Sequence, residues 1–116
     1  MSKSRKPLKY PRSLAFSRQN GNCYYCGLPM WTNDPQYFSS KYKISEKQAK
    51  HFKCTGEHLV AHQHGGSSQQ DNIVAACEFC NLQRHRRKSN PSPTQYKDFV
   101  QQRMDKGRWH NIRLAT

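Results

Sequence analysis

The chain has 116 residues, of which 34% are hydrophobic, and its 20 lysine and arginine residues outnumber 7 acidic ones, giving a net charge of +13. This length allows one small domain and not two, and a core this small needs a further cross-link or metal. No apolar run approaches the ~18 residues of a membrane span, and no apolar stretch near the N-terminus indicates a signal peptide. We therefore expect a cytoplasmic protein with no membrane partner.

Basic residues occur in every segment of the chain and are not confined to one tail. A small domain needs a net charge of only roughly 2–8 for solubility, and +13 exceeds that range. Aromatic residues make up 11% of the chain, which argues against a disordered basic tail. A folded basic domain most often binds a polyanion, so nucleic acid is the expected partner. A merely solubilising surface is the alternative.

The N-terminal third is expected to hold little regular structure. Residues 1–10 read as a flexible basic arm, and a short helix can run from Pro11 to about Asn20, where Asn-Gly is a stop signal. Cys23–Gly27 reads as a tight knuckle. Two prolines and many polar residues predict an irregular insertion over 28–43.

A helix from about Glu46 to His51 is predicted by the capping-box spacing of Ser45 and Gln48. A strand is expected next, over residues 52–60. A Gly- and Ser-rich loop over 61–71 should connect it to a second short strand over 73–76. We expect a further helix from near Glu78 to about Lys88.

Ser92 and Gln95 repeat the capping-box spacing, with Pro93 at the first helical position. Gly107 is a plausible stop for the helix that follows. The apolar face of this helix is expected to pack into the core rather than stack on bases, and it consists of Tyr96, Phe99, Val100 and Met104.

Two Cys-x-x-Cys knuckles, Cys23–Cys26 and Cys77–Cys80, are separated by 50 residues. Two such turns complete a closed tetrahedral site, which is how structural zinc is held, so the zinc would support the fold without taking part in chemistry. A redox dithiol is the alternative, but it needs a single Cys-x-x-Cys in a βαβ context, which is missing here. Cys54 is expected to be a buried free thiol on the first strand.

The segment between the knuckles carries the residues suited to chemistry. Residues 57–66 read Glu-His-Leu-Val-Ala-His-Gln-His-Gly-Gly, and Asn72 precedes Ile-Val-Ala-Ala-Cys-Glu-Phe-Cys-Asn. This block resembles the HNH endonuclease family, whose motif runs acid-His-aliphatic, a Gly-Gly loop, Asn, an aliphatic strand and Cys-x-x-Cys followed by Asn or His. The resemblance is nearly continuous over 57–88 and, with the first knuckle, extends over about 11–88.

The resemblance implies roles for four residues. His58 would be the general base that activates water, a task suited to a side chain whose ordinary pKa is ~6.5. Glu57 and Asn81 would be the ligands of a catalytic Mg²⁺ or Mn²⁺, since these ions prefer carboxylate and amide oxygens. Asn72 would hold the loop and orient the base.

Two positions depart from the commonest family pattern. The acid is often Asp and is Glu57 here, and the last position is often His and is Asn81 here. His85 shares a helix face with Asn81, so it is a further candidate ligand or a phosphate contact. Four basic residues on this helix are expected to bind nucleic-acid phosphates, although a solvated helix face is the alternative; they are Arg84, Arg86, Arg87 and Lys88.

We therefore expect an α+β fold, a small zinc-stapled domain with a central ββα-metal unit and flanking helices. Its predicted organisation is a basic arm over 1–10, an HNH nuclease domain over 11–88 and a helical extension over 89–116 that packs on the domain. The expected function is metal-dependent endonucleolytic hydrolysis of DNA phosphodiesters, with RNA left open as a substrate. A zinc-stabilised nucleic-acid-binding module that does not cut is the alternative.

Overall fold

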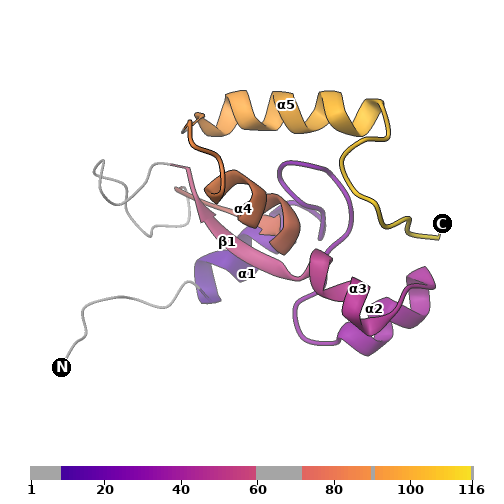
Figure 1. The fold of residues 1–116 in the computed structure, drawn as a ribbon. Coiled ribbons are helices and arrows are strands. Elements are labelled where there is room, and N and C mark those ends of the chain that lie inside the picture. The colour runs from indigo at the N-terminus through magenta and orange to yellow at the C-terminus, as the bar shows by residue number, and fades with distance from the viewer. Residues whose placement is uncertain (1–8, 60–71, 90, 116) are drawn as a thin grey trace.

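A computed structural model describes residues 9–59, 72–89 and 91–115 and has the mixed helix and strand composition expected (Figure 1). Its elements in chain order are α1 (Lys9–Arg18), α2 (Pro35–Tyr42), α3 (Glu46–Ala49), the 3₁₀ turn η1 (Lys50–Phe52), β1 (Cys54–His58), β2 (Ile73–Cys77), α4 (Glu78–His85) and α5 (Pro93–Asp105). Among these elements, no helix combines the length and the apolar character needed to cross a bilayer.

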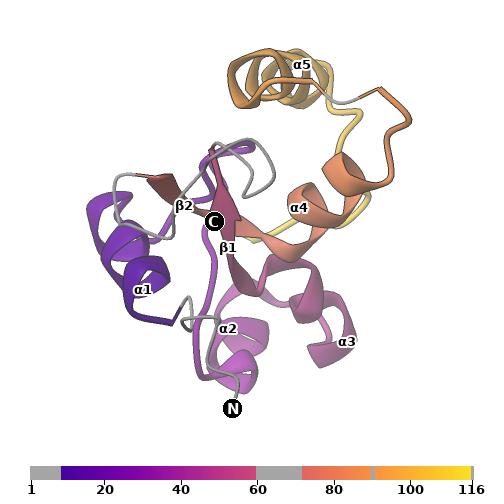
Figure 2. The same cartoon turned by 90° about the vertical axis from the view of Figure 1, so that its left-hand side faces the viewer.

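The centre of the fold is a two-stranded antiparallel ribbon of β1 and β2. Cys54 pairs with Cys77 at one end of the ribbon and His58 pairs with Ile73 at the other. Helix α1 lies on one side of the ribbon and α4 on the other, as Figure 2 shows. The ribbon and α4 form the ββα unit that the sequence predicted, since α4 begins directly after the last residue of β2.

The free edge of β2 is partly closed by a side chain from the segment after α1. Gln19 Nε2 donates to the carbonyl oxygen of Ala75 at 2.8 Å, and the Ala75 amide donates back to Gln19 Oε1 at 2.9 Å. One amide side chain thus pairs both backbone groups of a fully buried residue, and the Ala75 carbonyl also accepts from the Tyr24 amide at 2.9 Å.

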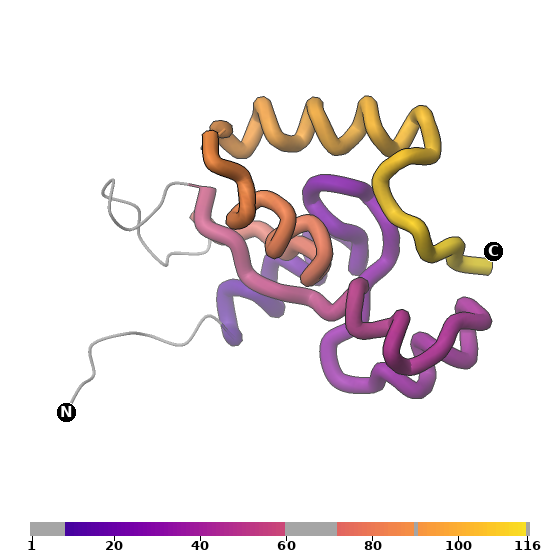
Figure 3. The backbone as a smooth tube through the Cα atoms, viewed as in Figure 1, coloured from indigo at the N-terminus to yellow at the C-terminus, as the bar shows by residue number. Residues whose placement is uncertain are grey.

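The buried residues form two clusters. The larger contains four buried cysteines from the two knuckles together with Tyr25, Tyr96 and Val100, so α5 packs directly over the knuckles. The smaller surrounds Phe38 and Phe52, between α2 and η1. Figure 3 shows the chain after α5 running back toward α2 and α3, where the Ala115 amide donates to the Tyr42 carbonyl at 3.0 Å.

Local sequence signals at the helix ends are confirmed. Ser45 and Ser92 both form complete capping boxes with the residue three positions later. Gly107 follows α5 with φ +65°, a conformation that glycine adopts without strain. Tyr96 and Val100 are buried, so the apolar face of α5 is core as expected.

The irregular insertion predicted over 28–43 was wrong in its second half, where α2 forms. Asp34 accepts a hydrogen bond from the Tyr37 amide and Pro35 occupies the first turn, so the proline starts the helix instead of breaking it. Burial of Phe38 then anchors this short helix to the smaller cluster. The prediction treated the prolines only as breakers.

Two predicted elements are shorter in the structure. The first strand spans Cys54–His58 rather than 52–60, because Phe52 ends the 3₁₀ turn. Helix α4 ends at His85 rather than near Lys88, and the Arg87 amide donates to Arg84 in a tighter final turn. Residues 9 and 10 of the basic arm predicted over 1–10 belong instead to α1, which runs over Lys9–Arg18 rather than from Pro11 to about Asn20. The rest of the arm and the loop over 61–71, with His62 and His64, lie outside the described residues.

We predict that Gln19→Ala lowers the free energy of unfolding by about 1–3 kcal/mol, because it leaves the buried amide of Ala75 without its partner and removes one of the two hydrogen bonds to the Ala75 carbonyl. Urea denaturation of the zinc-loaded protein measures this change. Gln102→Ala, on the exposed side of α5, is the matched control and should change stability by less than about 0.5 kcal/mol. Equal stability of the two variants would contradict the proposed edge closure.

Candidate metal centre and catalytic face

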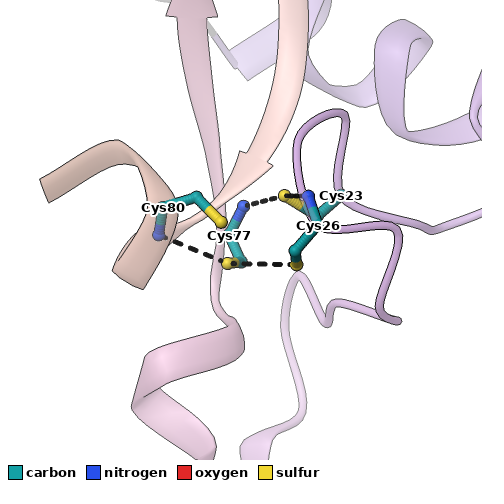
Figure 4. Close-up of side chains that lie close together, drawn as sticks. All are labelled: Cys23, Cys26, Cys77 and Cys80. Atoms are coloured by element: carbon teal, nitrogen blue, oxygen red, sulfur yellow. Dashed lines mark hydrogen bonds between the residues drawn. The ribbon is translucent and has the colours of Figure 1, made fainter. Parts of the chain in front are cut away.

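Four cysteine sulfurs from distant parts of the chain meet in the larger core cluster. The ligand atoms of Cys23, Cys26, Cys77 and Cys80 all lie within 4.8 Å of one another, and all four residues are buried (Figure 4). The Sγ atoms of Cys26 and Cys77 are 4.0 Å apart. Cys23 and Cys26 come from the turn after α1, whereas Cys77 and Cys80 span the junction of β2 and α4.

The donor set fits a tetrahedral zinc ion. Zn–S bonds of ~2.3 Å in a tetrahedron require sulfur–sulfur edges of about 3.8 Å, close to the spacing observed. All five cysteines are free thiols in the structure, so no disulfide competes for the four sulfurs. The tetrad is therefore a candidate structural zinc site, and Cys54 is the buried thiol outside it, as expected.

Hydrogen-bond donors surround the sulfurs. The amides of Tyr25 and Cys77 donate to Cys23 Sγ at 3.4 and 3.3 Å, and the indole Nε1 of Trp109 donates to Cys80 Sγ at 3.2 Å. Such donors stabilise thiolates and orient them toward a metal. The pKa of Cys26 is lowered, mainly by its hydrogen bond with Cys23. Burial instead raises the pKa of Cys54, outside the tetrad, to about 11.

Glu57 lies on the side of the ribbon that faces α4. It is the one buried charged residue in the described part of the chain, with 4% of its surface exposed. Its Oε2 accepts from Arg84 Nη1 at 2.9 Å and from the Tyr25 hydroxyl at 3.4 Å, and its Oε1 lies 3.3 Å from His85 Nε2. The acid that the sequence predicted as a metal ligand thus sits in a cluster of polar side chains.

Asn81 reaches the same face from the first turns of α4. Its Nδ2 donates to Thr55 Oγ1 at 3.0 Å and lies 3.5 Å from the carbonyl oxygen of Gly56, the residue before Glu57. Its Oδ1 is buried and has no hydrogen-bond partner among the described residues. A buried amide oxygen without a partner is costly, and a cation would satisfy it. Glu57 and Asn81 therefore fit a site for a hard divalent ion.

His58 and Asn72 lie at the end of the ribbon opposite the Cys54–Cys77 pair. His58 is the last residue of β1 and half-buried, and Asn72 directly precedes β2. The Leu59 amide donates to the Asn72 carbonyl at 2.9 Å. This bond joins Asn72 to the residue that directly follows His58. The structure brings them to the same end of the ribbon as Glu57.

The four basic residues predicted to bind phosphate divide into two kinds. Arg86, Arg87 and Lys88 are exposed after the end of α4, with the Arg87 guanidinium 4.5 Å from the Phe99 ring centroid. Arg84 points inward instead, with its side chain 12% exposed and both terminal nitrogens bonded within the protein. In this structure Arg84 therefore forms an ion pair with Glu57 and is not on the exposed surface where a phosphate contact was predicted.

The segment that contains these residues matches the model of a known protein family. Residues 45–87 match the family model of HNH endonucleases. The matched segment runs from the cap of α3 through the ββα unit to just beyond α4, so the resemblance inferred from the sequence is confirmed. It indicates a nuclease or nucleic-acid-binding function for the HNH segment. No match to a curated protein was found.

Several residues around the HNH segment escaped the sequence analysis. Tyr25 and Trp109, which contact Glu57 and Cys80, lie outside the matched residues and carry no motif. The Arg84–Glu57 pair joins residues 27 positions apart. With so many basic residues in the chain, the sequence did not distinguish Arg84 from the exposed arginines. The spacing of Arg84 from Asn81, one turn along α4, is a local signal that could have placed Arg84 on the ribbon side of the helix, but not against Glu57.

We predict that the purified protein binds one zinc ion per chain and that Cys26→Ser abolishes this binding. Chelation should unfold the domain cooperatively, because metal binding contributes folding free energy in a core this small. Elemental analysis and circular dichroism test both statements. Cys54→Ser, which alters the buried thiol outside the tetrad, is the control and should retain full zinc content. A native spectrum after complete zinc removal would disprove the stabilising role.

Proposed function

We propose that the protein is a metal-dependent endonuclease that hydrolyses phosphodiester bonds in DNA, with Zn²⁺ on the cysteine tetrad and Mg²⁺ or Mn²⁺ on Glu57 and Asn81. HNH family membership of residues 45–87 supports the reaction class. The observation that carries the proposal is the buried, unpartnered Oδ1 of Asn81, on the same face of the ribbon as the Glu57 carboxylate. RNA remains a second candidate substrate.

His58 is the proposed general base. It is the last residue of β1, and in this proposal the phosphate of a nucleic-acid strand lies at this end of the ribbon. His58 would accept a proton from the attacking water, and Asn72 would hold the adjoining backbone through its carbonyl contact to Leu59. A divalent cation bound by Glu57 and Asn81 would polarise the phosphate and stabilise the leaving oxygen.

The zinc site has a mechanical role in this proposal. Cys77 ends β2 and also caps α4 by accepting from the Cys80 amide, and Asn81 is the next residue. A metal held by both cysteines would therefore fix the corner that presents Asn81 to β1. Structural zinc sites supply this kind of rigidity in domains with small cores.

The proposed organisation is a nuclease domain over 11–88 and an extension over 89–116 that packs on it. Two contacts support this packing: the Tyr96 hydroxyl donates to the Cys80 carbonyl at 2.7 Å, and Trp109 contacts the Cys80 sulfur. The extension thus closes over the second knuckle. A zinc-stabilised module that binds nucleic acid without cutting is the alternative, and it gives Glu57, His58 and Asn81 no common purpose.

We predict that His58→Ala lowers the rate of plasmid cleavage by about 10²–10⁴-fold and leaves DNA affinity and zinc content unchanged, because a general base acts on the chemical step. Added imidazole should restore part of the rate. Cleavage is followed on agarose gels in the presence of Mg²⁺ or Mn²⁺. Full activity of folded His58→Ala would remove His58 from the mechanism.

A second pair of variants tests the ligand assignment. Glu57→Gln should abolish cleavage and divalent-ion binding, whereas Glu46→Gln, an exposed position on α3, should alter neither. If no variant and no metal yields cleavage while DNA binding persists, the non-cutting module is the correct function.

We predict that DNA binding is steeply salt-dependent and that Arg86→Ala with Lys88→Ala lowers the log–log salt slope by up to about two units, since each neutralised phosphate contributes roughly −0.9. The matched control removes the same charge from the end of α5 through Arg103→Ala and Lys106→Ala, and it should leave the slope nearly unchanged. Titrations at several salt concentrations give the slopes. Equal slopes for the two double variants would place the DNA elsewhere.

A further inference from the structure

The guanidinium of Arg84 makes its hydrogen bonds inside the protein. Its Nη1 donates to Glu57 Oε2 at 2.9 Å and its Nη2 donates to the Pro91 carbonyl at 3.0 Å, while its Nε is buried and lacks a partner among the described residues. A guanidinium stays protonated at every accessible pH, so this positive charge is permanent. Arg84 therefore links Glu57 to the segment between α4 and α5.

The cluster around Glu57 contains little negative charge to attract a divalent ion. Outside the cysteine tetrad, no group of three or more His, Cys, Asp or Glu side chains that could hold a metal occurs in the described residues. Glu57 is already neutralised by Arg84, and the neighbouring ligand, Asn81, is uncharged. The formal charge of Glu57 and Arg84 together is zero before any ion arrives.

A divalent ion that bound to Glu57 would lie close to the guanidinium of Arg84, and like charges repel strongly in a poorly solvated site. The carboxylate has enough lone pairs for both partners, so the obstacle is charge rather than space. A phosphate group brings the missing negative charge. The exposed basic residues after α4, including Arg86 and Lys88, are placed to attract it.

We propose, on the basis of the proposed nuclease function, that Arg84 couples divalent-ion binding at Glu57 to the arrival of a nucleic-acid phosphate. The protein alone binds the ion weakly, because Arg84 already compensates the carboxylate. The phosphate offsets the positive charge of Arg84, and the ion then binds tightly. Arg84 is a positioning residue in this scheme and acts through Glu57.

A purely structural role for Arg84 makes a different prediction. If Arg84 only tied Glu57 to Pro91, its replacement would lower stability and would weaken or leave unchanged the affinity for the ion. The coupling role predicts that removal of the charge strengthens ion binding in the absence of DNA. Ion affinity, measured apart from activity, therefore separates the two roles.

The experiment titrates Mn²⁺ into zinc-loaded protein and measures free Mn²⁺ by electron paramagnetic resonance, with and without a short DNA duplex. The His58→Ala background limits cleavage, and a titration of duplex alone corrects for ions bound to DNA. In this background the duplex should tighten Mn²⁺ binding by about 5–150-fold, the usual range of coupling between two ligands. Absence of any tightening would overturn the proposal.

Three Arg84 and Arg86 variants in the same background complete the test. Arg84→Gln should bind Mn²⁺ more tightly than its parent without duplex, and the duplex should add little further affinity. Arg84→Lys retains the charge and should behave like the parent, and Arg86→Gln removes an exposed charge two residues away and should not tighten binding of Mn²⁺ to the protein alone. Unchanged or weaker binding by zinc-loaded Arg84→Gln would overturn the coupling.

Failure of this inference can be distinguished from failure of the proposed site. If Glu57→Gln in the same background binds Mn²⁺ as well as its parent, the ion is not at Glu57 and the proposed ligand set is wrong. If Mn²⁺ binding depends on Glu57 but not on the charge at Arg84, only the coupling is wrong. If Arg84→Gln does not fold, failure of the duplex to tighten Mn²⁺ binding by the Arg84-containing parent would still overturn the proposal.

Discussion

The convergence of four thiols is the constraint on which the rest of this structure depends. Cys23 and Cys26 belong to a turn near the N-terminus, and Cys77 and Cys80 to a strand–helix corner more than 50 residues later. Their meeting brings α1 to one side of the β1–β2 ribbon and α4 to the other (Figure 2). A chain with 34% hydrophobic residues and a net charge of +13 has few other means of holding these segments together.

The same corner links stability to the proposed chemistry. Cys77 is the last residue of β2 and the cap of α4, and Cys80 directly precedes Asn81. The C-terminal extension adds two contacts to this corner, from Tyr96 and Trp109 to Cys80. Changes at the knuckle should therefore affect the catalytic face through position rather than through direct contact.

Charge compensation at the proposed catalytic face, the side of the ribbon that carries Glu57 and Asn81, is the second organising feature. Glu57 is buried, and burial of an unpaired carboxylate would be costly, so the Arg84 guanidinium and the Tyr25 hydroxyl support it. These contacts offset the cost of burying the Glu57 carboxylate when no divalent ion is bound to it. They also leave the site short of negative charge. The inference that the divalent ion binds together with a phosphate, rather than by itself, rests on this shortage.

The sequence by itself determined the cysteine tetrad, the ββα order, both capping boxes and the resemblance of one segment to HNH endonucleases, because each depends on residue types at short and regular spacings. Only the tertiary structure decided that Phe38 anchors α2 to the smaller cluster, that Gln19 closes the edge of β2 and that Arg84 faces Glu57. These features depend on burial and on contacts between residues far apart in the chain. Sequence spacing carries no information about such contacts, since one arginine among many reads the same whether it faces solvent or a buried carboxylate.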